Sequence, residues 1–343
     1  MRSPASFLFI LSCFCGLVCL YGCRPAEKRL IHRGFYYWKS SYTLDEPEEK
    51  ALTALKTEKL YIRFFDVEWN DATQNPSPVA PVHFAKAVPR PIQIVPVIFI
   101  TSETLQKTGI QKADSLAGNI DHLLSSLFRQ QNLPDPEEVQ IDCDWNTGTR
   151  ETYFQLLKQL RVSPFFRDKI LSVTIRLHQL KFIAGNGIPP ADKGLLMCYN
   201  MGNLKVPGTE NSIIDPAVLR SYIRKLNSYP LPLDIALPLF DWWVWFRGNN
   251  YKGLLHSEEF TPTEKKSTRF VFKKDTVING RFLSKGDWLR RETSPFSSIL
   301  ETGKLLGQRL QNRELNIVLY HLDSKNLSNY TNHELETIYN CFR

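Results

Sequence analysis

Cysteine is scarce outside the first two dozen residues of the chain. Of its seven cysteines, four lie in this N-terminal segment, and only Cys143, Cys198 and Cys341 remain in the rest of the 343 residues. Three isolated cysteines provide neither a disulfide framework nor the clustered ligands of a structural zinc site. We therefore expect Cys143 and Cys198 to be buried packing residues, and we predict neither a metal nor another cofactor.

Two other features are missing, and each argues against a class of ligand. The basic residues behind the net charge of +8 are spread along the chain, without the dense lysine and arginine run of a nucleic-acid-binding segment. No glycine-rich phosphate loop follows the first predicted strand, which argues against a nucleotide site. A basic exterior is better suited to anionic lipid head groups or acidic glycans.

The N-terminal segment predicts export. Residues 7–21 are almost wholly apolar, follow the positive charge of Arg2, and end just before Gly22 and Cys23. This pattern resembles a bacterial lipoprotein signal, in which a small residue precedes a cysteine that then carries lipid. An ordinary secretory peptide or an anchor helix is the alternative, although the apolar run is short for a membrane span. We predict a signal peptide over residues 1–22, a lipid anchor on Cys23 in a membrane of the bacterial cell envelope, and a polar tether over 23–33.

The rest of the chain alternates strand patterns with helix patterns. Eight apolar or alternating segments suit strands, and amphipathic helical segments separate most of them. The predicted strands cover residues 35–41, 59–70, 92–100, 138–146, 170–180, 194–202, 233–243 and 315–323. This order predicts one closed (β/α)8 barrel of the TIM type over residues 34–343, with a small inserted module, residues 247–292, between strands seven and eight. An open doubly wound sheet is the alternative.

Polar side chains recur near the carboxyl ends of the predicted strands, where the active sites of such barrels lie. In the fourth strand, alternation places Asp142, Asp144 and Asn146 on one face. The other strands contribute Asp66, Glu68, Arg176, His178, Tyr199, Asn200, Asp241, Trp242, Trp243, His321 and Asp323. Charged groups inside a barrel are costly unless they are paired or solvated. The set therefore predicts a polar pocket, with an internal layer of ion pairs as the purely structural alternative.

Three short segments resemble the family-18 glycoside hydrolases, the chitinase and endo-N-acetylglucosaminidase group. Residues 141–146, Ile-Asp-Cys-Asp-Trp-Asn, are similar to the fourth-strand signature of that family, which ends Asp-x-Asp-x-Glu. Residues 197–200 resemble its sixth-strand Met-x-Tyr-Asp/Asn, and residues 236–240 resemble its seventh-strand Gly-x-Pro-x-Tyr. The resemblance implies a glycan ligand, with Asp144 and Tyr199 at the positions that orient the acetamido group of the sugar.

The chain departs from the family pattern at Asn146. In the family, the glutamate at this position protonates the leaving glycosidic oxygen, whereas an amide cannot donate a proton as an acid does. We therefore predict a lipid-anchored barrel that binds a glycan without the standard family-18 hydrolysis. Its tryptophans are candidate stacking platforms for sugar rings, or else simple packing residues: Trp38, Trp242, Trp243 and Trp245. The alternatives are a glycosidase with a relocated acid, Glu68 or Asp144, and a non-enzymatic scaffold lipoprotein of a membrane assembly.

The candidate residues divide into two groups. The candidate catalytic residues are Asp144, Glu68, Asp142 and Tyr199. The candidate ligand contacts are Asn146, Asn200, Arg176, His178, Asp241, Trp242 and Trp243. A metal site built from Asp66, Glu68, Asp142 and His178 is a further alternative, but no pair of these residues has a diagnostic local spacing.

Overall fold

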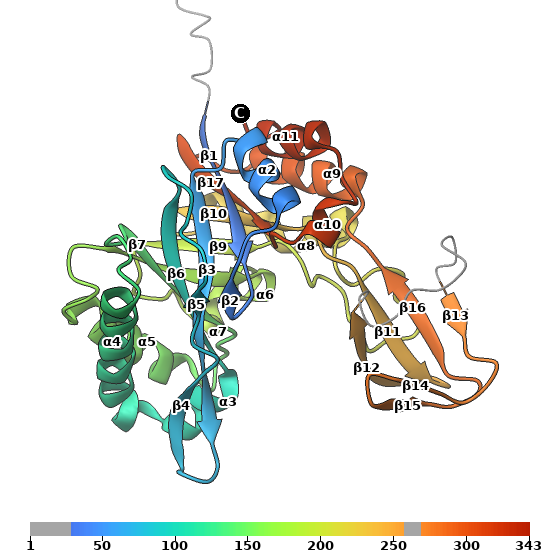
Figure 1. Ribbon diagram of the computed structural model, residues 1–343, viewed down its shortest axis with the longest axis horizontal. Coiled ribbons are helices and arrows are strands. Elements are labelled where there is room, and N and C mark those ends of the chain that lie inside the picture. Colours follow the sequence, from blue (N-terminus) through green and yellow to red (C-terminus); the bar gives the residue numbers. More distant parts are fainter. Residues whose placement is uncertain (1–28, 257–268) are drawn as a thin grey trace, which may run out of the picture.

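The computed structural model describes residues 29–256 and 269–343, and a closed barrel of eight parallel strands forms its centre (Figure 1). In chain order the barrel strands are β1 (Leu30–Tyr37), β3 (Lys59–Asn70), β6 (Gln93–Ile100), β7 (Glu138–Cys143), β8 (Ile170–Arg176), β9 (Lys193–Met197), β10 (Leu233–Pro238) and β17 (Glu314–Tyr320). Strand β1 pairs with both β3 and β17, and this double pairing closes the sheet. The predicted (β/α)8 fold is confirmed.

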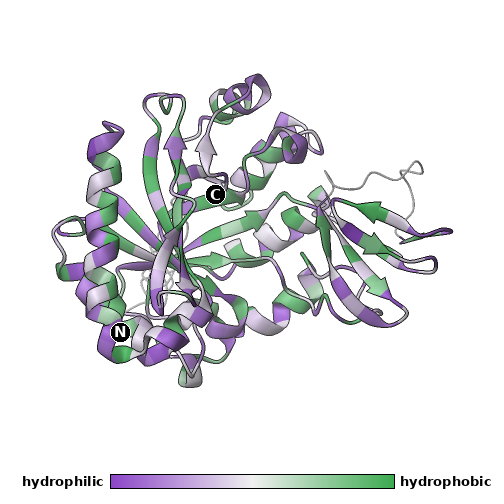
Figure 2. Ribbon diagram, turned by 60° about the horizontal axis from the view of Figure 1, so that its bottom comes forward, coloured by the Kyte–Doolittle hydropathy of each residue, from purple (hydrophilic) through white to green (hydrophobic). Residues whose placement is uncertain are grey.

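Helices connect most of the barrel strands and cover their outer faces. They are α2 (Glu46–Ala54), α3 (Ser102–Thr108), α4 (Ala113–Gln130), α5 (Arg150–Val162), α6 (Leu177–Lys181), α7 (Ile183–Asn186), α8 (Pro216–Tyr222), α9 (Phe296–Gly307), α10 (Ser324–Leu327) and α11 (Asn332–Asn340). In α4, Leu116, Ile120 and Leu124 recur at helical spacing and are buried, because they form the stripe that faces the sheet. Figure 2 shows apolar residues along the central strands and polar residues on the outer surfaces of the helices.

The barrel begins inside the segment that the sequence predicts to be a polar tether. Strand β1 starts at Leu30, and Ile31 and Arg33 are buried. The guanidinium of Arg33 donates from Nη1 to the carbonyl oxygen of Leu55 at 2.9 Å. A charged residue thus belongs to a barrel strand because the protein itself satisfies its hydrogen bonds. Residues 1–28, with the predicted signal peptide and Cys23, lie outside the described residues.

Strands β3 and β8 differ from the predicted strands, and each difference changes the position of a polar side chain. Strand β3 has a bulge between Arg63 and Phe65, and Arg63 donates two hydrogen bonds of 2.6 Å to Asp66. The bulge breaks the simple alternation because it inserts an extra residue. Strict alternation would place Asp66 on the face opposite Arg63, but the two side chains are hydrogen-bonded. Strand β8 ends at Arg176, and α6 follows at once, so His178 lies on a helix and not on the predicted strand.

The inserted module is a second, antiparallel sheet beside the barrel (Figure 1). Its strands are β12 (Asn250–His256), β11 (Trp242–Arg247), β16 (Trp288–Glu292) and β13 (Arg269–Val271), with a separate hairpin of β14 (Thr276–Ile278) and β15 (Arg281–Leu283). A turn at Asn279 and Gly280 joins β14 to β15. The module sheet begins at Trp242, before the predicted residue 247, because β11 pairs with β12 and β16 and not with the barrel. The smaller strands β2 (Ser41–Tyr42), β4 (Asn75–Val79) and β5 (His83–Phe84) complete the described sheets.

No helix within residues 29–256 or 269–343 has the length and apolar character needed to cross a membrane.

Candidate functional site

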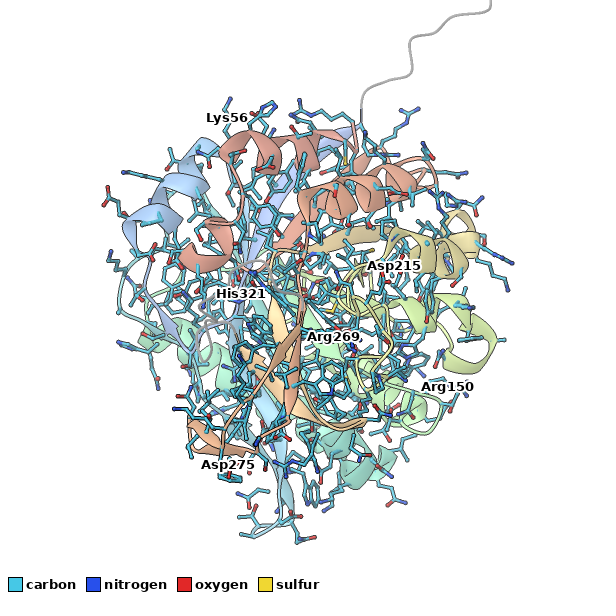
Figure 3. All side chains as sticks on the ribbon, turned by 90° about the vertical axis from the view of Figure 1, so that its right-hand side faces the viewer. Lys56, Arg150, Asp215, Arg269, Asp275 and His321 are labelled. Atoms are coloured by element: carbon cyan, nitrogen blue, oxygen red, sulfur yellow. The ribbon has the colours of Figure 1, made fainter. Side chains whose placement is uncertain are left out.

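A cavity of about 310 Å³, called here the main cavity, lies at the carboxyl ends of the barrel strands. The residues around it come from the barrel and from the inserted module: Trp38, Phe99, Asp142, Arg176, Met197, Tyr199, Asn200, Phe240, Asp241, Trp242, His256, Tyr320, His321, Asp323, Lys325 and Asn326. A neighbouring side cavity of about 300 Å³ shares Arg176, Tyr199 and Asn200 with it. In the view of Figure 3, His321 lies toward the middle of the molecule. The two cavities therefore lie on either side of shared side chains.

Arg176 links the two aspartates of the fourth-strand motif. Its Nε donates a hydrogen bond to Asp144, and its Nη2 lies 3.7 Å from Oδ1 of Asp142. The hydroxyl of Thr174 also donates to Oδ1 of Asp142, at 2.7 Å. Burial raises the pKa of Asp142 to about 6, although Arg176 opposes the shift. Asp142 is 2 % exposed, whereas the Asp144 side chain is 52 % exposed and lines the side cavity.

Tyr199 borders both cavities with a hydroxyl that makes no protein hydrogen bond. The residue is 5 % exposed, and its oxygen has no partner among the described residues. Its ring centroid lies 5.3 Å from that of Tyr320 and 5.8 Å from that of Phe240. A buried hydroxyl without a partner costs free energy. The Tyr199 hydroxyl is therefore an enclosed and unsatisfied polar group beside the two cavities.

Aromatic rings form much of the main cavity wall, but they include only two of the four predicted tryptophan platforms. Trp38 packs on Tyr320, with centroids 5.7 Å apart, and Trp242 donates from Nε1 to Glu292 at 2.8 Å. Trp243 and Trp245 instead belong to the separate core of the inserted module. Because side chains alternate along β11, only one of two neighbouring tryptophans can face the cavity.

Besides Asp144 and Trp243, three predicted site residues lie outside the main cavity. Asn146 is exposed in the loop after β7, and its Oδ1 accepts a hydrogen bond from the Gly148 amide at 2.8 Å. It lines neither the main nor the side cavity. Glu68 is exposed on the part of β3 that pairs with β4, also away from both linings. His178 lines only the side cavity, and burial lowers its pKa.

The remaining carboxylates of the main cavity are paired with cations. Asp241 accepts a hydrogen bond of 3.2 Å from Arg291, and Asp323 forms an ion pair of 3.0 Å with Lys39. Asp323 also accepts from the backbone amide of Lys325, at the start of α10. Among the described residues, no three histidine, cysteine or acidic side chains form a group suited to a metal ion.

Sequence reasoning missed a histidine and a lysine of the main cavity. His256 reaches it from β12 of the inserted module, and Lys325 reaches it from the short helix α10. Neither position belongs to a barrel strand, so no strand periodicity could indicate it. By contrast, the expected packing roles of Cys143 and Cys198 are confirmed, since both are fully buried.

No protein-family model matches the sequence, and no curated protein is similar to it in sequence. Solved structures are nevertheless similar in fold. A chitinase from Chromobacterium violaceum ATCC 12472 superposes with a TM-score of 0.53 at 12% identity, over 88% of this chain and 98% of that one. The family-18 chitinase ChiB from Flavobacterium johnsoniae superposes with a TM-score of 0.52 at 15% identity, over 92% of this chain and 94% of that one. The spore cortex-lytic enzyme SleL from Bacillus megaterium QM B1551 superposes with a TM-score of 0.55 at 13% identity, over 94% of this chain and 76% of that one. At these identities the similarity establishes the fold alone: this chain has the closed eight-stranded parallel barrel of the family-18 chitinases and chitinase-like proteins.

Proposed function

We propose that the protein binds a glycan with N-acetylated sugars in the main and side cavities and does not cleave it by the family-18 route. The structural neighbours include enzymes named as chitinases, and chitin is a polymer of N-acetylglucosamine. The observation that carries the proposal is the position of Asn146. The residue that replaces the acid is an amide, and its side chain is held by Gly148 outside both cavities.

The features that recognise a sugar are retained. Trp38 and Trp242 present aromatic surface to the main cavity, and aromatic rings pack well against the apolar faces of sugars. Asp144 and Tyr199, the positions that match the orienting residues of the family, both border the side cavity. The unpartnered hydroxyl of Tyr199 is enclosed beside the cavities, and a sugar that displaces its covering atoms and supplies an acceptor would satisfy it.

A relocated catalytic acid has less support. Glu68 is exposed and lies outside both cavity linings. Asp144 accepts a hydrogen bond from the Arg176 guanidinium, and a carboxylate engaged in this way has no proton to donate to a leaving oxygen. The Glu68 and Asp144 hypotheses therefore both lack the geometry of a general acid.

Titration calorimetry with a chitin tetrasaccharide, followed by chromatography of the sugar, tests the proposal. We expect saturable binding, an unchanged tetrasaccharide after prolonged incubation, and at least a tenfold loss of affinity in Trp38→Ala. Phe182→Ala is the matched control because Phe182 is 57% exposed and lines neither cavity. Absence of binding would overturn the glycan part of the proposal, and release of shorter sugars would overturn the non-hydrolytic part.

We further propose that lipid on Cys23 attaches the protein to a membrane of the bacterial cell envelope. The support is the sequence pattern of residues 7–23, together with the start of the barrel at Leu30, only a few residues later. Metabolic labelling with a radioactive fatty acid tests the attachment. The wild-type chain is expected to incorporate label and sediment with membranes, and Cys23→Ser is expected to do neither. Equal labelling of the two proteins would exclude Cys23 as the site.

A further inference from the structure

The hairpin of β14 and β15 exposes apolar side chains at the end of the inserted module. Val277 and Phe282 are direct cross-strand partners, and they are 64% and 56% exposed. Directly paired residues project from the same face of a two-stranded sheet, so the two side chains form one apolar surface. Val271 in β13 is also 56% exposed. We call the segment 271–285 the module tip.

The module tip is also basic. Lys273, Lys274 and Lys285 are exposed, and Asp275 is the acidic residue of this segment. One oxygen of Asp275 accepts a hydrogen bond of 2.7 Å from the backbone amide of Lys285. Figure 3 shows Asp275 at the lower edge of the molecule, well away from His321 of the main cavity.

Two buried acids in the described part of the module do not offset this charge. Asp287 is buried and paired with Arg247 at 2.9 Å, and Glu292 is buried and paired with Arg290 at 2.7 Å. Each of these carboxylates therefore neutralises a different arginine. The lysines of the module tip retain a positive surface around the exposed apolar pair.

We propose that the module tip docks on a lipid surface rich in anionic head groups. Such a surface complements both properties of the tip, since its head groups attract lysines and its acyl boundary takes up valine and phenylalanine side chains. An acidic polysaccharide would neutralise the lysines but would leave Val277 and Phe282 in contact with water. The proposal depends neither on glycan binding in the cavities nor on lipid at Cys23.

Sedimentation with vesicles tests the docking in the full chain. The vesicles contain equal amounts of phosphatidylglycerol and phosphatidylcholine, or phosphatidylcholine alone. The charge variant carries Lys273→Glu, Lys274→Glu and Lys285→Glu, and the apolar variant carries Val277→Ser and Phe282→Ser. The matched control reverses three exposed lysines elsewhere: Lys50→Glu, Lys112→Glu and Lys158→Glu. All proteins share the same N-terminal segment, so its contribution is equal throughout.

We expect the charge variant to bind the anionic vesicles on the order of 100-fold more weakly than the wild type, because each lysine near such a surface strengthens binding about fivefold. The apolar variant is expected to bind the anionic vesicles at least tenfold more weakly than the wild type. The control is expected to bind them as the wild type does. Equal binding by all four proteins would overturn the proposal. So would a loss of binding to heparin in the charge variant without any loss on vesicles, since that result would identify the tip as a polysaccharide site.

Discussion

Arg176 donates a hydrogen bond from Nε to the carboxylate of Asp144. The same guanidinium approaches Asp142, so one cation from β8 serves two carboxylates from the end of β7. The ion pair between Arg176 and Asp142 is part of the predicted layer of internal ion pairs. Both residues line the main cavity, so this layer does not lie in a filled interior. The site is both a structural link between neighbouring strands and a surface for a ligand.

Removing this cation should damage folding and binding together. Arg176→Ala leaves the buried Asp142 without its counter-charge, and breaking a buried ion pair costs about 3–5 kcal/mol. We expect a loss of this order in the free energy of unfolding, measured by urea denaturation, and no detectable glycan binding. Arg176→Lys keeps the charge and is expected to recover part of the stability. A stability of Arg176→Ala equal to that of the wild type would show that Asp142 does not need this partner.

Stability should fall as Asp142 ionises. Because burial raises its pKa to about 6, the native state keeps this proton at pH values where the unfolded chain has already released it. Raising the pH from 4 to 7 therefore removes up to about 3 kcal/mol of stability through this group. Urea denaturation across that range should show a weaker pH dependence in Asp142→Asn, which has no proton to release. An identical pH dependence in both proteins would contradict the assignment.

The Tyr199 hydroxyl should matter for the ligand and not for folding. It has no partner among the described residues, so Tyr199→Phe is expected to change the free energy of unfolding by less than about 1 kcal/mol while weakening glycan binding about tenfold. Tyr36→Phe is the matched control, because the Tyr36 hydroxyl donates to the buried Gln140. That variant should lose stability by about 1–3 kcal/mol. Full glycan affinity in Tyr199→Phe would exclude a ligand contact at this oxygen.

A glutamate placed at position 146 should not produce hydrolysis. A side chain at position 146 projects from a loop that turns through Gly148, outside both cavities. We expect Asn146→Glu to leave a chromogenic chitobioside intact, since a general acid must lie within hydrogen-bond reach of the leaving oxygen. Calorimetry should still detect glycan binding and thereby show that the variant is folded. Release of the chromophore would mean that this loop rearranges when the sugar binds.

Two neighbouring tryptophans should give opposite phenotypes. Trp242 lines the main cavity, whereas Trp243 is 2% exposed in the core of the inserted module. Trp242→Phe keeps an aromatic ring but loses the hydrogen bond to Glu292, and it should mainly weaken glycan binding. Trp243→Ala should instead lower the free energy of unfolding by about 3–5 kcal/mol. Calorimetry and thermal unfolding of both variants separate the two effects, and equal losses of affinity would contradict the alternation along β11.

Local sequence patterns were sufficient to predict the strands and the fold class. Continuous apolar runs mark covered parallel strands, and β6, which is apolar and mostly buried after Gln93, is an example. The pattern also predicted the positions of Asp142 and Tyr199 at strand ends, because carboxyl ends of parallel strands meet at one rim. The set of polar residues that converge at this rim was therefore predictable from the sequence.

The exact orientation of individual side chains was not predictable from the sequence. The bulge in β3 turned Asp66 toward Arg63, and the end of β8 at Arg176 moved His178 onto α6. Both changes depend on hydrogen bonds with partners that periodicity does not specify.

The sequence by itself determined the order of strands and helices, the asparagine at position 146 in a motif that resembles Asp-x-Asp-x-Glu, and the set of polar residues near the strand ends. Only the tertiary structure decided that Trp242 and Tyr199 border the main cavity while Asn146, Glu68 and Trp243 do not. The physical reason is that alternation fixes which residues share a face within one strand, whereas strand ends, bulges and the placement of the inserted sheet depend on contacts between segments far apart in the chain.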